Sequence, residues 1–157
     1  MTEINSIYFL DLEQTIVSSF GDPVLCNVTR IKNFLSSRGA TAVHIFSFAI
    51  YNDTDKKTFD REIKPMIETA LELPVMTAPS VLDMIRADYK FTGERFDSDF
   101  AVIDYIRLRG KKIGFYNYVC DTYDFNTAVL IDDTMPDETV VNRKKGWRIE
   151  YWNVDSI

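Results

Sequence analysis

The stretch "SIYFLDLEQTIVSS", residues 6–19, decides the fold of this chain. Its first half is apolar and rich in aromatic and branched residues, which is typical of a strand buried on both faces of a sheet. We expect that strand over residues 5–12. It runs into two acids, Asp11 and Glu13, and Thr15 follows. Because carboxylates at the end of a buried strand are costly without a compensating charge, the same stretch indicates a functional site.

The next fifty residues predict a strand–helix–strand unit. Residues 27–38 have the apolar spacing of an amphipathic helix, with Asn27 as its N-cap and Gly39 after its last turn. Residues 41–50, "TAVHIFSFAI", form a second apolar run of strand composition. A strand, a helix and a strand in this order predict parallel pairing with a right-handed crossover.

The rest of the chain continues the alternation. We expect helix over 54–73, interrupted near Pro65, a short strand within 74–79, a helix over 81–89 capped by Ser80, a helix over 97–108, a strand over 127–132 and an edge strand over 146–154. Residues 111–123 fit either a strand or a short helix. The sequence therefore predicts an α/β fold: a single Rossmann-like three-layer α/β/α domain spanning residues 1–157, with a mostly parallel sheet.

Composition narrows the class of protein. The chain has 157 residues and a formal net charge of −6, which argues against coating a nucleic acid, although the basic cluster at 142–148 leaves a local path open. No apolar run approaches the roughly 18 residues of a membrane span. The polar N-terminus lacks the pattern of a secretory signal. Cys26 and Cys120 do not form a disulfide framework, so we expect a cytoplasmic location.

A second pair of acids follows another apolar strand. Asp132 and Asp133 come at the end of the predicted strand 127–132. In open parallel sheets, ligands bind beyond the carboxyl ends of the strands. If the two acidic strands are neighbours, their carboxylates converge and repel one another by several kcal/mol, unless a cation is present. Carboxylate oxygens suit Mg²⁺, which also leaves room for phosphate oxygens.

These motifs resemble those of the haloacid dehalogenase-like superfamily. "FLDLEQT" (9–15) resembles its first motif, an apolar strand followed by Asp-x-Asp-x-Thr, and "VLIDDTMPD" (129–137) resembles its fourth. "VHIFSFA" (43–49) is similar to the second motif, a strand ending in Ser or Thr. Lys111 and Lys112 are candidates for the basic third motif. The resemblance spans residues 5 to about 152.

The resemblance implies phosphatase activity through an aspartyl-phosphate. Asp11 would be the nucleophile and a Mg²⁺ ligand. Glu13 would bind the metal through its backbone carbonyl, and its side chain would act as general acid and then base. Ser47 would donate a hydrogen bond to a phosphoryl oxygen. Lys112, or alternatively Lys111, would neutralise charge on the nucleophile and the phosphoryl group.

The remaining motif residues would support the metal and the loop. The resemblance implies that Asp133 is a direct metal ligand, with Asp132 or Asp137 orienting its waters. Thr15 would stabilise the loop after the nucleophile through its hydroxyl. The loop 13–26 is too short for a cap domain, so we expect a capless protein. An open site favours a large phosphorylated substrate, such as a protein, a polynucleotide end or a glycan.

Glu13 departs from the family pattern, in which the second acid is usually Asp. Its carboxyl lies one methylene, about 1.5 Å, further out, and a misplacement of about 1 Å can cost on the order of 100-fold in rate. Three interpretations follow: a phosphatase with a rearranged loop, a slow phosphatase or phosphotransferase, or a non-catalytic domain of this fold that binds a partner.

Asp-x-Glu after a first strand also resembles the start of DnaQ-like 3′–5′ exonucleases. Those enzymes need a late His or Tyr before a final Asp, and their first strand usually continues into an antiparallel meander. Here His44 comes too early, and Tyr118 or Tyr123 before Asp124 would have to take its place. The predicted strand–helix–strand order and the negative net charge both favour the phosphatase.

Overall fold

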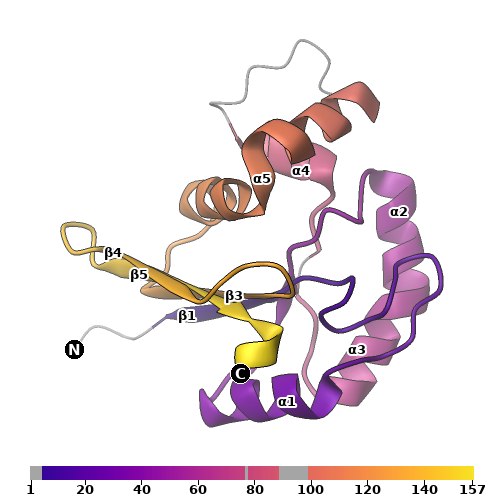
Figure 1. Cartoon of the computed structure of the whole chain (residues 1–157), viewed down its shortest axis with the longest axis horizontal. Helices are drawn as coiled ribbons and strands as arrows, with labels where there is room; N and C mark the ends of the chain where they lie inside the picture. The colour runs from indigo at the N-terminus through magenta and orange to yellow at the C-terminus, as the bar shows by residue number, and fades with distance from the viewer. Residues whose placement is uncertain (1–4, 77, 89–98) are drawn as a thin grey trace.

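The computed structural model describes residues 5–76, 78–88 and 99–157, and it contains a five-stranded, mostly parallel sheet (Figure 1). The strand order is β2-β1-β3-β5-β4, and only β4 runs antiparallel to its neighbour. The strands are β1 (Ser6–Leu10), β2 (His44–Ile45), β3 (Thr127–Asp132), β4 (Glu138–Asn142) and β5 (Trp147–Asn153).

Helices cover both faces of this sheet. On β1, Ile7 and Phe9 contribute to the core under α4 and α5, whereas Tyr8 and Leu10 contribute to the core under α1 and α3 (Figure 1). Both faces of β1 are therefore buried, as its continuous apolar run predicts. The helices are α1 (Val28–Ser37), α2 (Asp53–Thr58), α3 (Lys64–Leu71), α4 (Val81–Ala87) and α5 (Asp99–Thr122). The α/β fold with a mostly parallel sheet is confirmed.

Two strand predictions are corrected. The strand expected over 41–50 shrinks to β2, because Val43 makes only an isolated bridge to Val75 and the chain leaves the sheet after Ile45. The last strand is not at the edge: β5 lies between β3 and β4. The strand β4 was not predicted, because its largely exposed residues give no buried apolar pattern.

The helix predictions hold except at one cap and at Pro65. Asn27 has a left-handed backbone (φ 55°) and makes no side-chain capping bond; its Nδ2 instead donates to the carbonyl of Thr15 at 2.9 Å. Ser80 caps α4 in a reciprocal capping box, as predicted. The segment 54–73 is divided, but not by Pro65: a π-helical turn, η1 (Phe59–Ile63), separates α2 from α3, Lys64 is helical, and Pro65 is accommodated in the first turn of α3. Residues 77, 89, 97 and 98 of the predicted elements lie outside the described residues.

Helix α5 is interrupted at Gly110, whose backbone (φ 74°, ψ 168°) is not helical. A residue with a side chain rarely adopts this geometry, so glycine permits the chain to change direction here. Residues 111–122, ambiguous in sequence, continue as helix after the break. The direction in which the helix resumes after Gly110 determines where the side chains of Lys111 and Lys112 point. A final 3₁₀ turn, η2 (Val154–Ser156), closes the described chain.

Candidate metal and phosphate site

The register of β1 and β3 brings the two acidic motifs together. Leu10 pairs with Ile131, and the N–H of Asp11 donates to the carbonyl of Ile131 at 3.0 Å. The residues that follow, Asp11 on one strand and Asp132 and Asp133 on the other, therefore leave the sheet side by side. One carboxylate oxygen from each lies within 4.8 Å of the other two. The convergence of these three acids agrees with the sequence-based expectation.

Lys111 is the lysine that reaches this cluster. Its Nζ lies 2.8 Å from Oδ1 of Asp11 and 3.4 Å from Oδ2 of Asp132, and its side chain is largely buried. The expectation that Lys112 faces the site is corrected. Successive residues of a helix point about 100° apart, and Lys112 pairs instead with Glu138, with its Nζ 5.8 Å from the ring centroid of Tyr151.

The pKa values of the two strand-end acids, Asp11 and Asp132, are shifted in opposite directions. Burial and the neighbouring Asp132 raise the pKa of Asp11 to about 7, although Lys111 opposes the change. Burial also raises the pKa of Asp132, but Lys111 and hydrogen bonds from Thr134 outweigh it and hold that pKa below its ordinary value. Without another cation, the pair favours one proton on Asp11 and a negative charge on Asp132.

Thr134, which sequence analysis did not single out, fixes Asp132. Its backbone N–H and its hydroxyl both donate to Oδ1 of Asp132, each at 2.7 Å. Oδ2 of Asp132 is buried and accepts no hydrogen bond within the described chain, although it lies near Lys111. The Asp-x-Thr pattern of "DDT" was the available signal, because a Thr two positions after Asp commonly closes such a turn.

A cavity of about 470 Å³ opens above these acids. Ser47 forms part of it from the loop after β2; its side chain is buried, and its Oγ accepts a hydrogen bond from the N–H of Ala49 at 3.1 Å. Among the described residues, none accepts a hydrogen bond from the Ser47 hydroxyl, so its proton is available to a ligand. The cavity is lined by Asp11, Glu13, Gln14, Ser47, Phe48, Ala49, Tyr51, Ile106, Lys111, Asp132, Asp133 and Thr134.

The loop after β1 holds Glu13 at the cavity. Oε2 of Glu13 accepts a hydrogen bond from the backbone N–H of Phe20 at 2.9 Å, so the longer side chain is tied to its own loop. The expectation for Thr15 is corrected: its hydroxyl is buried and has no hydrogen-bond partner among the described residues. Its carbonyl, which accepts from Asn27, makes the contact that secures the loop.

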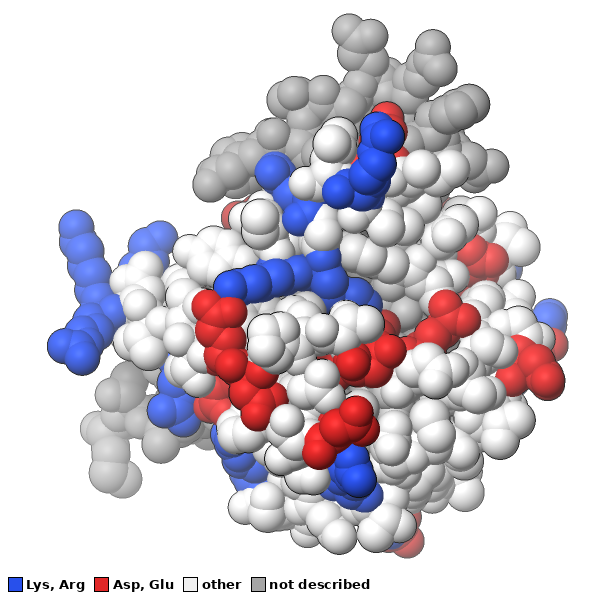
Figure 2. Space-filling model, in the orientation of Figure 1, with Lys and Arg blue, Asp and Glu red and all other residues white. Residues whose placement is uncertain are grey.

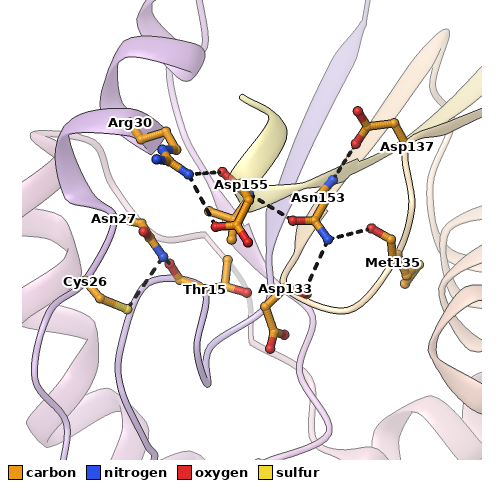
Figure 3. A network of polar contacts seen from close by, with 10 residues as sticks. Thr15, Cys26, Asn27, Arg30, Asp133, Met135, Asp137, Asn153 and Asp155 are labelled. Atoms are coloured by element: carbon orange, nitrogen blue, oxygen red, sulfur yellow. Dashed lines mark hydrogen bonds and ion pairs between the residues drawn. The ribbon is translucent and has the colours of Figure 1, made fainter.

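Asp137 lies apart from the carboxylate cluster. Its Oδ1 accepts from the backbone N–H of Asn153 at 2.7 Å (Figure 3). The side chain of Asn153 donates in turn to the carbonyls of Asp133 and Met135, at 3.3 and 3.0 Å. Asp137 and Asn153 therefore fasten the loop that carries Asp133, and the Asp133 carboxylate points away from Asn153 (Figure 3). Asn153 follows Trp152 with no motif around it, so its part in the site was not readable from the sequence.

The donor set fits a hard divalent cation. The three carboxylates are opposed by one lysine, which leaves a formal charge of −2 when all are ionised, and every ligand atom offered is a carboxylate oxygen. Mg²⁺, Mn²⁺ and Ca²⁺ prefer such ligands, whereas a Zn²⁺ site would normally offer His or Cys. Asp11, Asp132 and Asp133 could therefore hold a metal ion.

No family model, curated protein or solved structure matches this chain. Among the described residues, no helix is long and apolar enough to cross a membrane. On the face shown in Figure 2, acidic side chains form a broken row across the middle of the molecule, with basic side chains scattered around them. That face offers no continuous basic track of the kind that follows a nucleic-acid backbone.

The geometry does not assemble an exonuclease-like set of residues. Asp124 precedes β3, and its carbonyl accepts from Nδ2 of Asn5, which precedes β1. It therefore lies at the amino ends of these strands, opposite the edge that carries Asp11. The ring of His44 packs against Phe9 and Tyr123, with centroids 4.9 and 5.6 Å apart, and does not line the cavity above the acids.

Proposed function

We propose that this chain is a capless, single-domain member of the haloacid dehalogenase-like superfamily and acts as a Mg²⁺-dependent phosphatase through an aspartyl-phosphate on Asp11. The observation that carries the proposal is the contact of Lys111 with both Asp11 and Asp132, beside Asp133, at the carboxyl edge of a parallel sheet. A nucleophilic carboxylate, a buried cation and adjacent metal-binding carboxylates are the parts that phosphoryl transfer requires.

Asp11, Asp133 and the backbone carbonyl of Glu13 would hold the ion, with Asp132 beside them. When bound, Mg²⁺ supplies positive charge that offsets the oxygens of the transferring phosphoryl group. Lys111 supplies further positive charge to the same region, since its Nζ already contacts Asp11. Ser47 donates its hydroxyl proton to a phosphoryl oxygen, because its Oγ already accepts from Ala49.

The chemistry proceeds in two displacements at phosphorus. A carboxylate oxygen of Asp11 bonds to phosphorus while the ester P–O bond breaks, and the departing oxygen takes a proton from Glu13. Water then loses a proton to Glu13 and attacks phosphorus, the bond to Asp11 breaks, and inorganic phosphate leaves. The second displacement thus returns to Glu13 the proton that it gave up in the first, and it frees the Asp11 carboxylate.

A non-catalytic binding domain is the second candidate. The observation that favours it is the hydrogen bond from Phe20 to the Glu13 carboxylate, which commits that side chain to its own loop. In this reading the site binds a divalent cation and a phosphorylated partner, and water activation is lost. The two functions use the same site residues and differ only in whether the Glu13 side chain transfers protons, so a substitution at Glu13 distinguishes them.

The test is phosphate release from a panel of phosphomonoesters with and without Mg²⁺. Wild type is compared with Asp11→Asn, Glu13→Asp and a control, Asp60→Asn, which removes an exposed carboxylate that does not line the cavity. We expect activity in wild type and the control, and its loss in Asp11→Asn. Activity only in Glu13→Asp would establish the binding domain instead. Absence of activity in every form, without a Mg²⁺-dependent rise in melting temperature, would overturn both readings of the metal site.

A further inference from the structure

The cavity above the acids is lined by both polar and apolar side chains. The strand-end acids, Lys111 and Ser47 are assigned by the proposed function to the metal and the phosphoryl group. The apolar wall of the cavity is supplied by Phe48, Ala49, Tyr51 and Ile106, and Phe48 lies beside Lys111. A phosphomonoester placed with its phosphate at the acids therefore has this apolar wall next to it for contact with its leaving group.

The aromatic part of this wall is held rigidly. The ring of Phe48 contacts Phe46 and Tyr105, with centroids 6.0 and 6.1 Å away, and both of those rings are fully buried. Nζ of Lys111 lies 4.9 Å from the Phe48 centroid. Phe48 itself is only half-buried and lines the cavity. A ring fixed from behind in this way offers a preformed contact surface, which lowers the entropic cost of binding another ring.

The polar side chains that line the cavity offer little to a polar leaving group, because they already hold hydrogen bonds or lack the charge that would pair with it. Nε2 of Gln14 donates to the carbonyl of Ser18 at 2.7 Å, and Glu13 accepts from Phe20. Within the described lining, Lys111 is the only cation, and it contacts Asp11 and Asp132. A second phosphate would find no further cationic side chain in the described lining, and sugar hydroxyls would lose water against Phe48, Ala49 and Ile106, which offer no side-chain hydrogen bonds in return.

We propose, building on the phosphatase function above, that the substrate is a phosphomonoester with an aromatic leaving group whose ring lies against Phe48 and Tyr51. The half-exposed Tyr51 contributes a second ring to the lining of the cavity. Ring–ring contact and apolar burial select such a group, and the absence of a second cationic side chain from the described lining disfavours nucleoside diphosphates and sugar bisphosphates.

The first experiment measures kcat/KM for benzyl phosphate, cyclohexylmethyl phosphate and glycerol 1-phosphate with Mg²⁺. All three release a primary alcohol, so differences in intrinsic reactivity are small. We expect benzyl phosphate to exceed glycerol 1-phosphate by about tenfold or more, the discrimination typical of an apolar pocket. It should also exceed cyclohexylmethyl phosphate by roughly two- to tenfold, the range of an aromatic pair. Equal values for the three esters would overturn the proposal.

Two variants test whether the ring of Phe48 causes the preference for an aromatic leaving group. Phe48→Leu keeps an apolar side chain beside Lys111 but removes the ring, and it should bring the benzyl-to-cyclohexylmethyl ratio of kcat/KM close to one. Leu108→Ala is the matched control, because Leu108 is 68% exposed on α5 and does not line the cavity. An unchanged ratio in Phe48→Leu would place recognition elsewhere and refute the assignment.

The same readout separates failure of this inference from failure of the proposed function. If all three esters are hydrolysed in an Asp11-dependent manner at equal rates, the phosphatase stands and the substrate class is wrong. If none is hydrolysed by wild type, the phosphatase itself fails, and the inference with it. A phosphotyrosyl peptide and free phenyl phosphate complete the panel. A higher kcat/KM for the peptide assigns the ring to a protein substrate, and an equal or higher value for phenyl phosphate assigns it to a small molecule.

Discussion

Replacement of Lys111 by Met should destabilise the fold, because it removes the positive charge that offsets repulsion within the acidic cluster. Lys111→Met retains most of the apolar stem but removes the charge that lies 2.8 Å from Asp11 and 3.4 Å from Asp132. The remaining carboxylates have oxygens within 4.8 Å of each other. At an effective dielectric constant of about 20, that separation corresponds to a repulsion of about 3.5 kcal/mol per ionised pair. We therefore expect the free energy of unfolding to fall by about 3 kcal/mol, the usual loss when a buried ion pair is broken.

Urea unfolding followed by the fluorescence of Trp147 and Trp152 measures this loss, first in EDTA and then with Mg²⁺. Because the metal replaces the missing positive charge and binds only the folded site, Mg²⁺ should reduce the deficit. Lys112→Met is the matched control. Lys112 is half-exposed and pairs with Glu138 at the surface, so its loss should cost less than about 1 kcal/mol. A Lys111→Met variant no less stable than Lys112→Met, or a deficit that Mg²⁺ leaves unchanged, would refute the reasoning.

Three further outcomes are expected. Thr134→Val removes the hydroxyl that donates to Asp132 at 2.7 Å; it should weaken Mg²⁺ binding, measured as a smaller metal-induced rise in melting temperature, and an unchanged rise would contradict it. Asn153→Ala frees the loop after β3 and should lower the free energy of unfolding by about 1–3 kcal/mol in urea melts, the cost of unpaired buried groups. Arg38 and other partners hold the pKa of Glu150 below 4.5 despite burial, which raises it. The ionised Glu150 carboxylate therefore stabilises the fold above pH 4.5, and this stabilisation is lost as the pH falls through the lowered pKa. Glu150→Gln should make the free energy of unfolding depend less on pH below about 5.

Sequence periodicity could predict the convergence of the acids but not the identity of the lysine. Asp11 and Asp132 each follow an apolar run long enough to mark a buried strand, and parallel pairing then brings them to one edge. Lys111 and Lys112 are adjacent and chemically alike. Which of them turns inward depends on the direction in which the helix resumes after Gly110, and that is set by tertiary packing rather than by local pattern.

The supporting contacts of the site were hidden for a similar reason. Asn153 acts through a strand, β5, that reaches the loop after β3 only once the sheet is formed. The edge strand β4 went unpredicted because neither of its faces is buried. For Thr15 a predicted contact is missing: a hydrogen bond from its hydroxyl was expected, but its carbonyl accepts from Asn27 instead. Side-chain roles that depend on backbone direction are not encoded in residue spacing.

The interior place of β1 in the sheet has a consequence for how the chain reaches its native state. β1 is synthesised well before its principal neighbour, β3, which begins at Thr127, and the partner available earlier, β2, has only two residues. Until Thr127–Asp132 emerge, the apolar strand β1 keeps one hydrogen-bonding edge open, the condition under which nascent chains associate with one another. Pairing across this sequence separation is slow. Completing the acidic cluster and closing that edge are the same event, so a metal ion that binds the cluster would favour chains that have escaped aggregation.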